Sequence, residues 1–245
     1  MSWAAHELEN FWLLKHLGMR VSYLGLLLGA LAPDFLTKLY VYGFTLAGHT
    51  FKADNPAQFH RGWPGMGFTT SIMAGLLFAL FIYIVTKRNR AWFWGTFAGY
   101  TAHAFTDAAD SAGVMLLWPF YNENLSIGMW AYGAGEGKLG DAVAYYGSPG
   151  FLMDFVVLLV VVVSAWRVLS SEYFFSVVKP ADPAWDFMAR GLRMPDRVLL
   201  ATYRAFFLYG ATRIIAWVIW VHVLQSHPWD LSWGGPYWVE PFEPW

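Results

Sequence analysis

The sequence of 245 residues contains no cysteine, and this absence excludes several kinds of chemistry. Without thiols the chain forms no disulfide bonds, offers no thiolate nucleophile, and builds no cysteine-ligated zinc or iron–sulfur site. Any metal that the protein binds must therefore be held by histidine nitrogens, by carboxylates or by other oxygen ligands.

Charged residues are scarce as well. Asp, Glu, Lys and Arg together make up 13% of the chain, against roughly 25% in an average soluble domain. Residues of the set AVILMFWYC make up 57%, and the 16 basic and 17 acidic residues leave a formal net charge of -1. There is thus no basic field that would attract nucleic acid. The composition predicts an integral membrane protein with no nucleic-acid partner.

The N-terminus lacks the basic segment and apolar core that mark a cleavable signal peptide. Residues 1–14 instead contain His6, Glu7, Glu9 and Asn10. We therefore expect no cleavable signal peptide.

The sequence does contain a series of long apolar stretches, and a transmembrane helix needs about 20 mostly apolar residues. Four stretches qualify, and a fifth, the first in the chain, is shorter: residues 68–86, 91–118, 150–169 and 199–225, and residues 17–32. We predict an all-α fold, a polytopic integral membrane helical bundle with about five transmembrane helices. Pro33 should end or kink the first of them. Residues 1–228 should form a single helical domain, followed by a Trp- and Pro-rich tail over residues 229–245.

The distribution of Lys and Arg predicts the orientation of the bundle. Basic residues concentrate in the loops that follow the second and the fourth spans: Lys87, Arg88 and Arg90, and Lys179, Arg190, Arg193 and Arg197. Short loops rich in Lys and Arg lie on the cytoplasmic side. The N-terminus is then also cytoplasmic, whereas residues 34–67, residues 120–149 and the tail lie on the outer side.

Residues 178–194, between the last two spans, combine Trp185 and Phe187 with prolines and arginines. One interpretation is an amphipathic helix on the cytoplasmic membrane surface. The alternative is an ordinary loop whose Trp side chain reaches toward the headgroups.

Ionisable side chains occur in the third predicted span, where each costs about 2.5 to 3.5 kcal/mol to insert. His103 and Asp107 are four residues apart, and Asp110 is three residues further along. This spacing places all three on one face of a helix. Such residues persist in membranes mainly where they pair, bind a ligand or face water. This face is therefore the first candidate for a functional site.

The predicted topology brings further polar residues to the same outer leaflet. Asp34 follows the first span, His60 and Arg61 precede the second, and Asp154 opens the fourth. Imidazole and carboxylate groups suit Zn, Mn or Fe. A bound dication would neutralise the carboxylates and lower the pKa of a water molecule to about 7. We therefore predict a divalent metal site, with zinc as the first choice and Mn or Fe as alternatives.

A buried ionic network without a metal is the alternative interpretation of the same residues. Arg213 lies near the centre of the fifth span and could form a structural ion pair with Asp107 or Asp110. Such a pair explains one or two of the acids. It does not explain His and Asp residues in four separate segments.

Several stretches of the sequence carry a resemblance to a known family. The most specific runs from His103 to Pro119, His-Ala-Phe-Thr-Asp-Ala-Ala-Asp-Ser-Ala-Gly-Val-Met-Leu-Leu-Trp-Pro. The others are Pro33-Asp34, with His6 upstream, and His60-Arg61-Gly62, while the acid Asp154 is a weaker match. Together they resemble the motifs of the membrane-bound metal-dependent hydrolases of the YdjM type.

The resemblance implies an integral-membrane hydrolase of the bacterial inner membrane that acts on a lipid or a phosphoester through a metal-activated water. The implied metal ligands come from distant parts of the chain: His6, Asp34, His60, His103 and Asp107. Asp107 and Arg61 would act in catalysis, with Arg61 binding an anionic substrate. Candidate additional residues of the site are Asp110, Asp154 and His49. Membrane lipid is the implied partner.

The sequence also departs from the family's pattern, because the second His of the motif that begins at His60 is missing. Gly65 or Thr70 stands in its place, depending on the alignment. The alternative function is therefore a non-catalytic accessory or scaffold subunit of a larger membrane complex, whose Trp-rich tail contacts partner subunits. A transporter, the third reading, would need broken helices or an inverted repeat, and the sequence contains neither.

Overall fold

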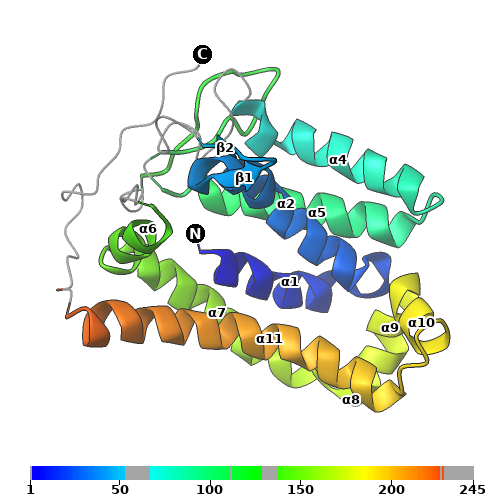
Figure 1. Cartoon of the computed structure of the whole chain (residues 1–245). Helices are drawn as coiled ribbons and strands as arrows, with labels where there is room; N and C mark the ends of the chain where they lie inside the picture. The colour runs from blue at the N-terminus through cyan, green and yellow to red at the C-terminus, as the bar shows by residue number, and fades with distance from the viewer. Residues whose placement is uncertain (1, 53–66, 111, 129–136, 227, 229–245) are drawn as a thin grey trace.

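The computed structural model describes residues 2–52, 67–110, 112–128, 137–226 and 228, and this part of the chain is mostly helical (Figure 1). The longer helices, in chain order, are α1 (Trp3–Leu17), α2 (Tyr23–Tyr42), α4 (Ile72–Val85), α5 (Arg90–Asp107), α6 (Gly137–Tyr146), α7 (Gly150–Val168), α10 (Pro183–Arg190) and α11 (Asp196–Val218). Shorter helical pieces are η1 (Gly18–Arg20), η2 (Gly67–Thr70), α8 (Ser171–Tyr173), η3 (Phe174–Val178), α9 (Lys179–Ala181) and η4 (Ile219–Leu224).

The all-α prediction needs one correction, a two-stranded antiparallel hairpin after α2. Strand β1 (Phe44–Leu46) pairs with β2 (His49–Phe51), with Phe44 opposite Phe51. The two turn residues, Ala47 and Gly48, have φ angles of 50° and 81°. Positive φ at both positions is the geometry of a tight hairpin turn, and no strand was predicted for this short segment.

Helix α1 lies between two groups of helices (Figure 1). Helices α2, α4 and α5 lie on one side of it, and α7 and α11 lie on the other. Helix α1 runs parallel to α7, because Ser2 N is 3.3 Å from Asp154 Oδ1 near the start of α7. Near the other end of both helices, the hydroxyl of Tyr173 donates to the carbonyl oxygen of Leu14 at 2.8 Å.

Two glycines let α2 and α5 approach each other closely. A Cβ atom at Gly29 would lie 2.1 Å from the carbonyl oxygen of Thr96, and one at Gly99 would lie 2.1 Å from that of Leu26. Because both distances are far inside van der Waals contact, only glycine fits at these positions. The resulting parallel packing fixes the register of the two helices and places Asp34 of α2 beside α5.

Helix α1 supplies the centre of the hydrophobic core. The buried side chains of Leu8, Phe11 and Leu14 pack against α2 and α11. The ring of Phe11 lies 5.1 Å from that of Tyr23 and 5.6 Å from that of Tyr203, measured between centroids. This packing holds the polar first turns of α1 inside the protein.

Asp182 joins three helices at one end of the bundle. Its buried carboxylate accepts hydrogen bonds from Ser22 Oγ at 2.6 Å and from Trp92 Nε1 at 3.1 Å. It also accepts from the backbone amides of Leu24 at 3.3 Å and Ala184 at 3.0 Å, and the latter bond caps α10. Burial raises the pKa of Asp182, and these hydrogen bonds partly oppose that effect.

The segment interpreted either as an interfacial helix or as a loop is helical over Pro183–Arg190. Its Trp185 is fully buried. The indole ring packs against Phe174 and Tyr203, with centroids 5.3 and 6.3 Å away. A helix is thus confirmed. A Trp that reaches toward the headgroups is not observed, because aromatic side chains at this end of the bundle surround it.

Two helices among the described residues are long and apolar enough to cross a membrane, Gly150–Val168 and Asp196–Leu224. They correspond to the fourth and fifth predicted spans. Two shorter apolar helical segments, Tyr23–Thr37 and Ile72–Val85, correspond to the first and second.

The first and third predicted spans differ in detail from the structure. Helix α2 continues through Pro33 to Tyr42, so of the two expected effects Pro33 does not end the helix, and a kink stays a prediction. A proline removes one hydrogen bond inside a helix, and a packed helix tolerates that loss. Helix α5 ends at Asp107, and the chain then turns back so that Ile127 N donates to the carbonyl oxygen of Ala108 at 2.8 Å.

The N-terminus lies at the end of the bundle opposite the basic loops (Figure 1). Helix α1 starts beside Asp154 and ends next to the turn into α2, where Ser22 N donates to Ala91 O at the start of α5. The N-terminus and the basic loops therefore do not share one side, contrary to the predicted topology. The prediction omitted α1 because Glu7, Glu9 and Asn10 make it polar, yet the fold buries all three.

Candidate metal centre

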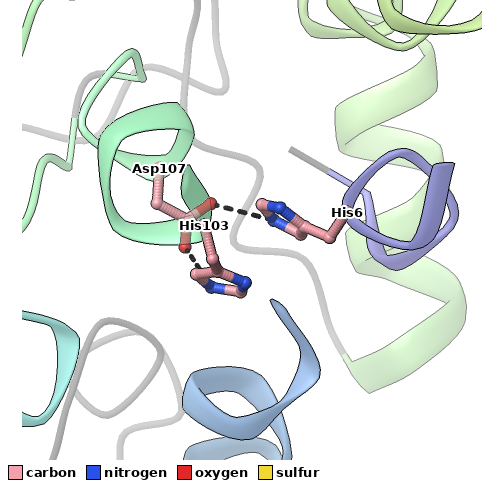
Figure 2. A group of neighbouring side chains, drawn as sticks. All are labelled: His6, His103 and Asp107. Atoms are coloured by element: carbon pink, nitrogen blue, oxygen red, sulfur yellow. Dashed lines mark ion pairs between the residues drawn. The ribbon is translucent and has the colours of Figure 1, made fainter. Parts of the chain in front are cut away.

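Three buried side chains face one another where α1 passes α5 (Figure 2): His6, His103 and Asp107. His103 and Asp107 are one helical turn apart on α5, and His6 comes from α1. One ligand atom of each residue lies within 4.8 Å of those of the other two. The helix face predicted from the sequence thus acquires a third member from the N-terminal helix.

The separations within this His–His–Asp group match those of ligands on a common ion. Nε2 of His103 lies 3.1 Å from Oδ2 of Asp107, and Nε2 of His6 lies 3.4 Å from Oδ1. Two atoms bound about 2.0 to 2.1 Å from one ion at a tetrahedral angle are about 3.3 Å apart. The group therefore fits a small divalent cation.

The two Nε2 atoms face the Asp107 carboxylate at these distances without a well-aligned hydrogen bond. Both are buried, and neither has a hydrogen-bond partner of acceptable geometry among the described residues. A buried polar atom left in this way costs about 1 to 3 kcal/mol. A cation between the nitrogens and the carboxylate would remove this cost at both atoms, so the group could hold a metal ion.

The other nitrogen of each imidazole ring is already held. Nδ1 of His103 lies 2.6 Å from the carbonyl oxygen of Ala30, which can only accept, so Nδ1 carries the proton. Nδ1 of His6 lies 3.4 Å from Oε1 of Glu9 and 3.4 Å from Oγ1 of Thr106. A proton on Nδ1 leaves the lone pair on Nε2 for a metal. The two rings stack with centroids 3.8 Å apart, which keeps both Nε2 atoms near Asp107.

Asp34, a predicted ligand, lies at the edge of the His–His–Asp group. Its side chain is buried, and Oδ1 is 3.9 Å from Nε2 of His103. The close packing of α2 on α5 puts it there. Asp34 thus brings one further carboxylate, from α2, to the edge of the three grouped residues.

Two other predicted residues have structural roles. Oδ1 of Asp110 accepts hydrogen bonds from the amides of Ala112 and Gly113, at 3.1 and 3.2 Å, and so stabilises the turn after α5. Asp154 accepts from the hydroxyl and the amide of Ser2, and from two tyrosine hydroxyls, Tyr145 at 2.7 Å and Tyr146 at 2.8 Å. Asp154 therefore fixes the start of α1 against α7.

The remaining predicted residues do not join the group in the described structure. His49 lies on strand β2 and is exposed, while His60 and Arg61 fall outside the described residues. Arg213 does form an ion pair, but with Oε1 of Glu7 at 2.6 Å rather than with Asp107 or Asp110. The predicted metal-free network centred on Arg213 and Asp107 is therefore replaced by a pair between α11 and α1.

Glu9 is a site residue that the sequence analysis missed. It lies three positions after His6, so both side chains project from adjacent turns of one helix face. A carboxylate that holds the far nitrogen of a ligating histidine orients the ring and raises its basicity. The spacing of His6 and Glu9 was the available signal, but it gains meaning only once His6 is known to be a ligand.

Comparison with known proteins places this site in a family. The model of a family described as YdjM inner membrane protein matches residues 4–177. The matched region contains all three members of the His–His–Asp group, together with Asp34 and Glu9. No curated protein matches the chain, and no solved structure does.

Proposed function

Because the chain belongs to the YdjM inner membrane protein family, we propose that it is an integral-membrane hydrolase whose His–His–Asp group holds a divalent metal ion. The observation that supports this most directly is the pair of buried Nε2 atoms beside Asp107 that lack hydrogen bonds. Zinc suits two imidazoles and one carboxylate, and catalytic zinc sites with three protein ligands keep a position open for water.

The roles of the residues follow from their positions. When bound, a divalent ion lowers the pKa of a water molecule and polarises an ester or phosphoryl oxygen. His6, His103 and Asp107 would hold the ion, the Asp107 carboxylate would balance its charge, and Asp34 would offer a further carboxylate from α2. Arg61, which precedes the second span in the sequence, binds the anionic part of the substrate. The substrate we propose is a lipid or a phosphoester, because the site belongs to a membrane protein.

The membrane arrangement is part of the proposal. We place α2, α4 and α5 across the bilayer beside α7 and α11, giving about five spans. Exposed apolar side chains along α4, such as Leu77, Phe81 and Ile84, support this. The end with the basic loops faces the cytoplasm. The N-terminus and the metal centre then face the outer side of the inner membrane.

Metal content of the purified full-length chain tests the proposal. We expect about one divalent ion per chain in the wild type, measured by elemental analysis. His103→Ala should contain almost none. His16→Ala, an exposed histidine at the other end of α1, serves as the matched control and should keep the ion. If wild type and His103→Ala are equally empty after purification with added zinc, the metal centre is refuted.

Hydrolysis is tested separately from binding. The zinc-loaded wild type in detergent should cleave a chromogenic phosphodiester, and His103→Ala should lose this activity. Arg61→Ala should weaken substrate binding while retaining the ion. If the wild type binds zinc but cleaves neither phosphodiester nor carboxylic ester probes, the hydrolase activity is refuted, whereas the metal centre is not.

A non-catalytic accessory subunit is the second candidate, and Thr70 is the observation that favours it. One alignment puts the missing histidine of the family motif at this position, and the threonine here is buried at the end of η2, just before α4. The partner would be another membrane subunit that contacts the tail, whose residues 229–245 fall outside the described structure. Purification in mild detergent should then recover a partner with the full chain and lose it when residues 232–245 are deleted.

A further inference from the structure

We propose that the segment joining α7 to α11 forms a binding surface for anionic phospholipid headgroups. This segment covers residues 169–195 and includes α8, η3, α9 and α10. It lies at the end of the bundle opposite the metal centre (Figure 1). The proposal does not depend on the metal or on the hydrolase.

The position of the segment follows from the two candidate spans. The first ends at Val168 and the second begins at Asp196, so the chain between them leaves and re-enters the bilayer on one side. Tyr203 OH donates to the carbonyl oxygen of Val168 at 3.2 Å, and Arg204 Nε donates to that of Leu169 at 2.9 Å. These bonds tie the two spans together at the level where they reach the membrane surface.

Helix α10 is held rigidly at this level. Trp185 on its inner side is fully buried, and Asp182 at its N-terminus accepts hydrogen bonds from α2 and α5. Its outer side carries Phe187, which is 64% exposed, and the following turn carries Leu192, which is 59% exposed. A rigidly mounted apolar pair that projects outward suits the boundary between headgroups and acyl chains.

Charges of both signs surround these two apolar side chains, but two of the exposed acids are already paired, Asp196 with Lys179 at 2.7 Å and Asp186 with Arg190. Arg190 pairs with Asp186 at 3.2 Å. Arg193 and Arg197 are exposed, and within the described part of the chain neither forms an ion pair. The neighbouring turns add further exposed basic residues at this end of the bundle: Arg20, Lys87, Arg88 and Arg90.

The chemistry of this surface selects its ligand. Guanidinium groups bind the phosphate oxygens of a headgroup with paired hydrogen bonds, while Phe187 and Leu192 enter the acyl region beneath. A lipid with net negative charge, such as phosphatidylglycerol, satisfies both features, and a zwitterionic lipid satisfies only the second. Each basic residue near an anionic membrane surface strengthens association by roughly fivefold.

The absence of cysteine from the chain allows a clean test. A nitroxide label on Leu192→Cys in the full chain, reconstituted in bilayers, should be accessible to oxygen and protected from a water-soluble nickel reagent. Labels on Leu159→Cys and Thr50→Cys give the membrane and water references, because Leu159 is 67% exposed near the middle of α7 and Thr50 is exposed on the hairpin. A Leu192 label as accessible to nickel as the Thr50 label overturns the proposal.

The charge requirement is tested with lipid composition. The Leu192 label should lie deeper in bilayers with one third phosphatidylglycerol than in pure phosphatidylcholine. The double variant Arg193→Gln/Arg197→Gln should lose most of this difference, whereas Arg190→Gln, which removes an already paired charge, should keep most of it. If the double variant keeps the full difference, the headgroup assignment is refuted. It is also refuted if the label is immobilised only in native membranes, because that result would indicate a protein partner.

Discussion

Asp107 and Asp154 are both buried carboxylates at the same end of the molecule, but their surroundings differ. Asp154 receives hydrogen bonds from three hydroxyl groups and one amide, each of which brings its own proton. Asp107 faces two imidazole nitrogens that lack hydrogen bonds, on rings whose other nitrogens are already occupied. The first arrangement is complete without a ligand, whereas the second could hold a cation between the carboxylate and the two imidazoles.

Asp182 extends the comparison to the opposite end of the bundle. Four donors surround it, from α2, α5 and α10. It therefore resembles Asp154 rather than Asp107. The three compared carboxylates thus fall into two kinds, since Asp154 and Asp182 join helices and Asp107 faces histidines, and the nature of their donors separates the two kinds.

The largest expected difference between the two kinds is the response to metal. Zinc at about 1,000 times its dissociation constant should stabilise the wild type by about 4 kcal/mol. His6→Ala should remove this increment. Asp154→Asn should lower the starting stability but keep the increment. Thermal unfolding in detergent, with and without zinc, measures both, and a zinc increment that survives in His6→Ala would contradict the comparison.

The next effect is structural. Asp182→Ala leaves the Ser22 hydroxyl and the Trp92 indole without their acceptor and removes the cap of α10, at a cost of about 2 to 4 kcal/mol. Asp186→Ala, an exposed acid on the same helix, should cost at most about 0.5 kcal/mol. Chemical denaturation of both variants compares them. Equal losses would show that Asp182 does not join the helices.

A smaller effect should come from Glu9. Glu9→Gln weakens the hold on Nδ1 of His6 and should lower zinc affinity by about 10- to 100-fold, as loss of such outer contacts typically does. Glu7→Gln is the matched control, because Glu7 is a buried glutamate on the same helix but pairs with Arg213. It should lower stability and leave zinc affinity unchanged. Competition with a chromogenic chelator gives the affinities, and the reverse pattern would remove Glu9 from the site.

The smallest effect concerns pH. Burial raises the pKa of Asp182, so the folded protein holds this proton more tightly than the unfolded chain does. The contribution of Asp182 to stability is then greatest below the unfolded pKa of about 3.9 and decreases as pH rises through the raised pKa. The unfolding temperatures of the wild type and Asp182→Asn are compared from pH 4 upward. The wild type should lose stability relative to the variant as the pH rises. An opposite slope would mean that the hydrogen bonds outweigh burial.

Much of the site was predictable where it depends on local spacing. His103 and Asp107 share a helix face because they are four residues apart, and the structure groups them. The predicted topology added Asp34, which lies beside the group, and the family resemblance added His6, which lies in it. The roles of Asp110 and Asp154 were not predictable, because their donors include backbone amides and the residue Ser2, far along the chain.

The topology was predictable only in part for a related reason. Apolar length identified α7 and the helix that begins with α11 as candidate spans, and it also marked α2 and α4 as shorter apolar helices. It could not identify α1, whose polar side chains made it look unsuited to the interior. Those side chains are buried only because Glu7 meets Arg213 on α11, while His6 meets α5.

By itself, the sequence determined that any metal must be bound by nitrogen and oxygen, that helices dominate, and that one helix face carries a histidine and an aspartate. These properties depend on composition and on the period of a helix. Only the tertiary structure decided which buried acids are surrounded by hydrogen-bond donors and which face imidazole nitrogens without well-aligned partners. The difference depends on contacts between donors and acceptors of separate helices. The periodicity within one helix gives no information about those contacts.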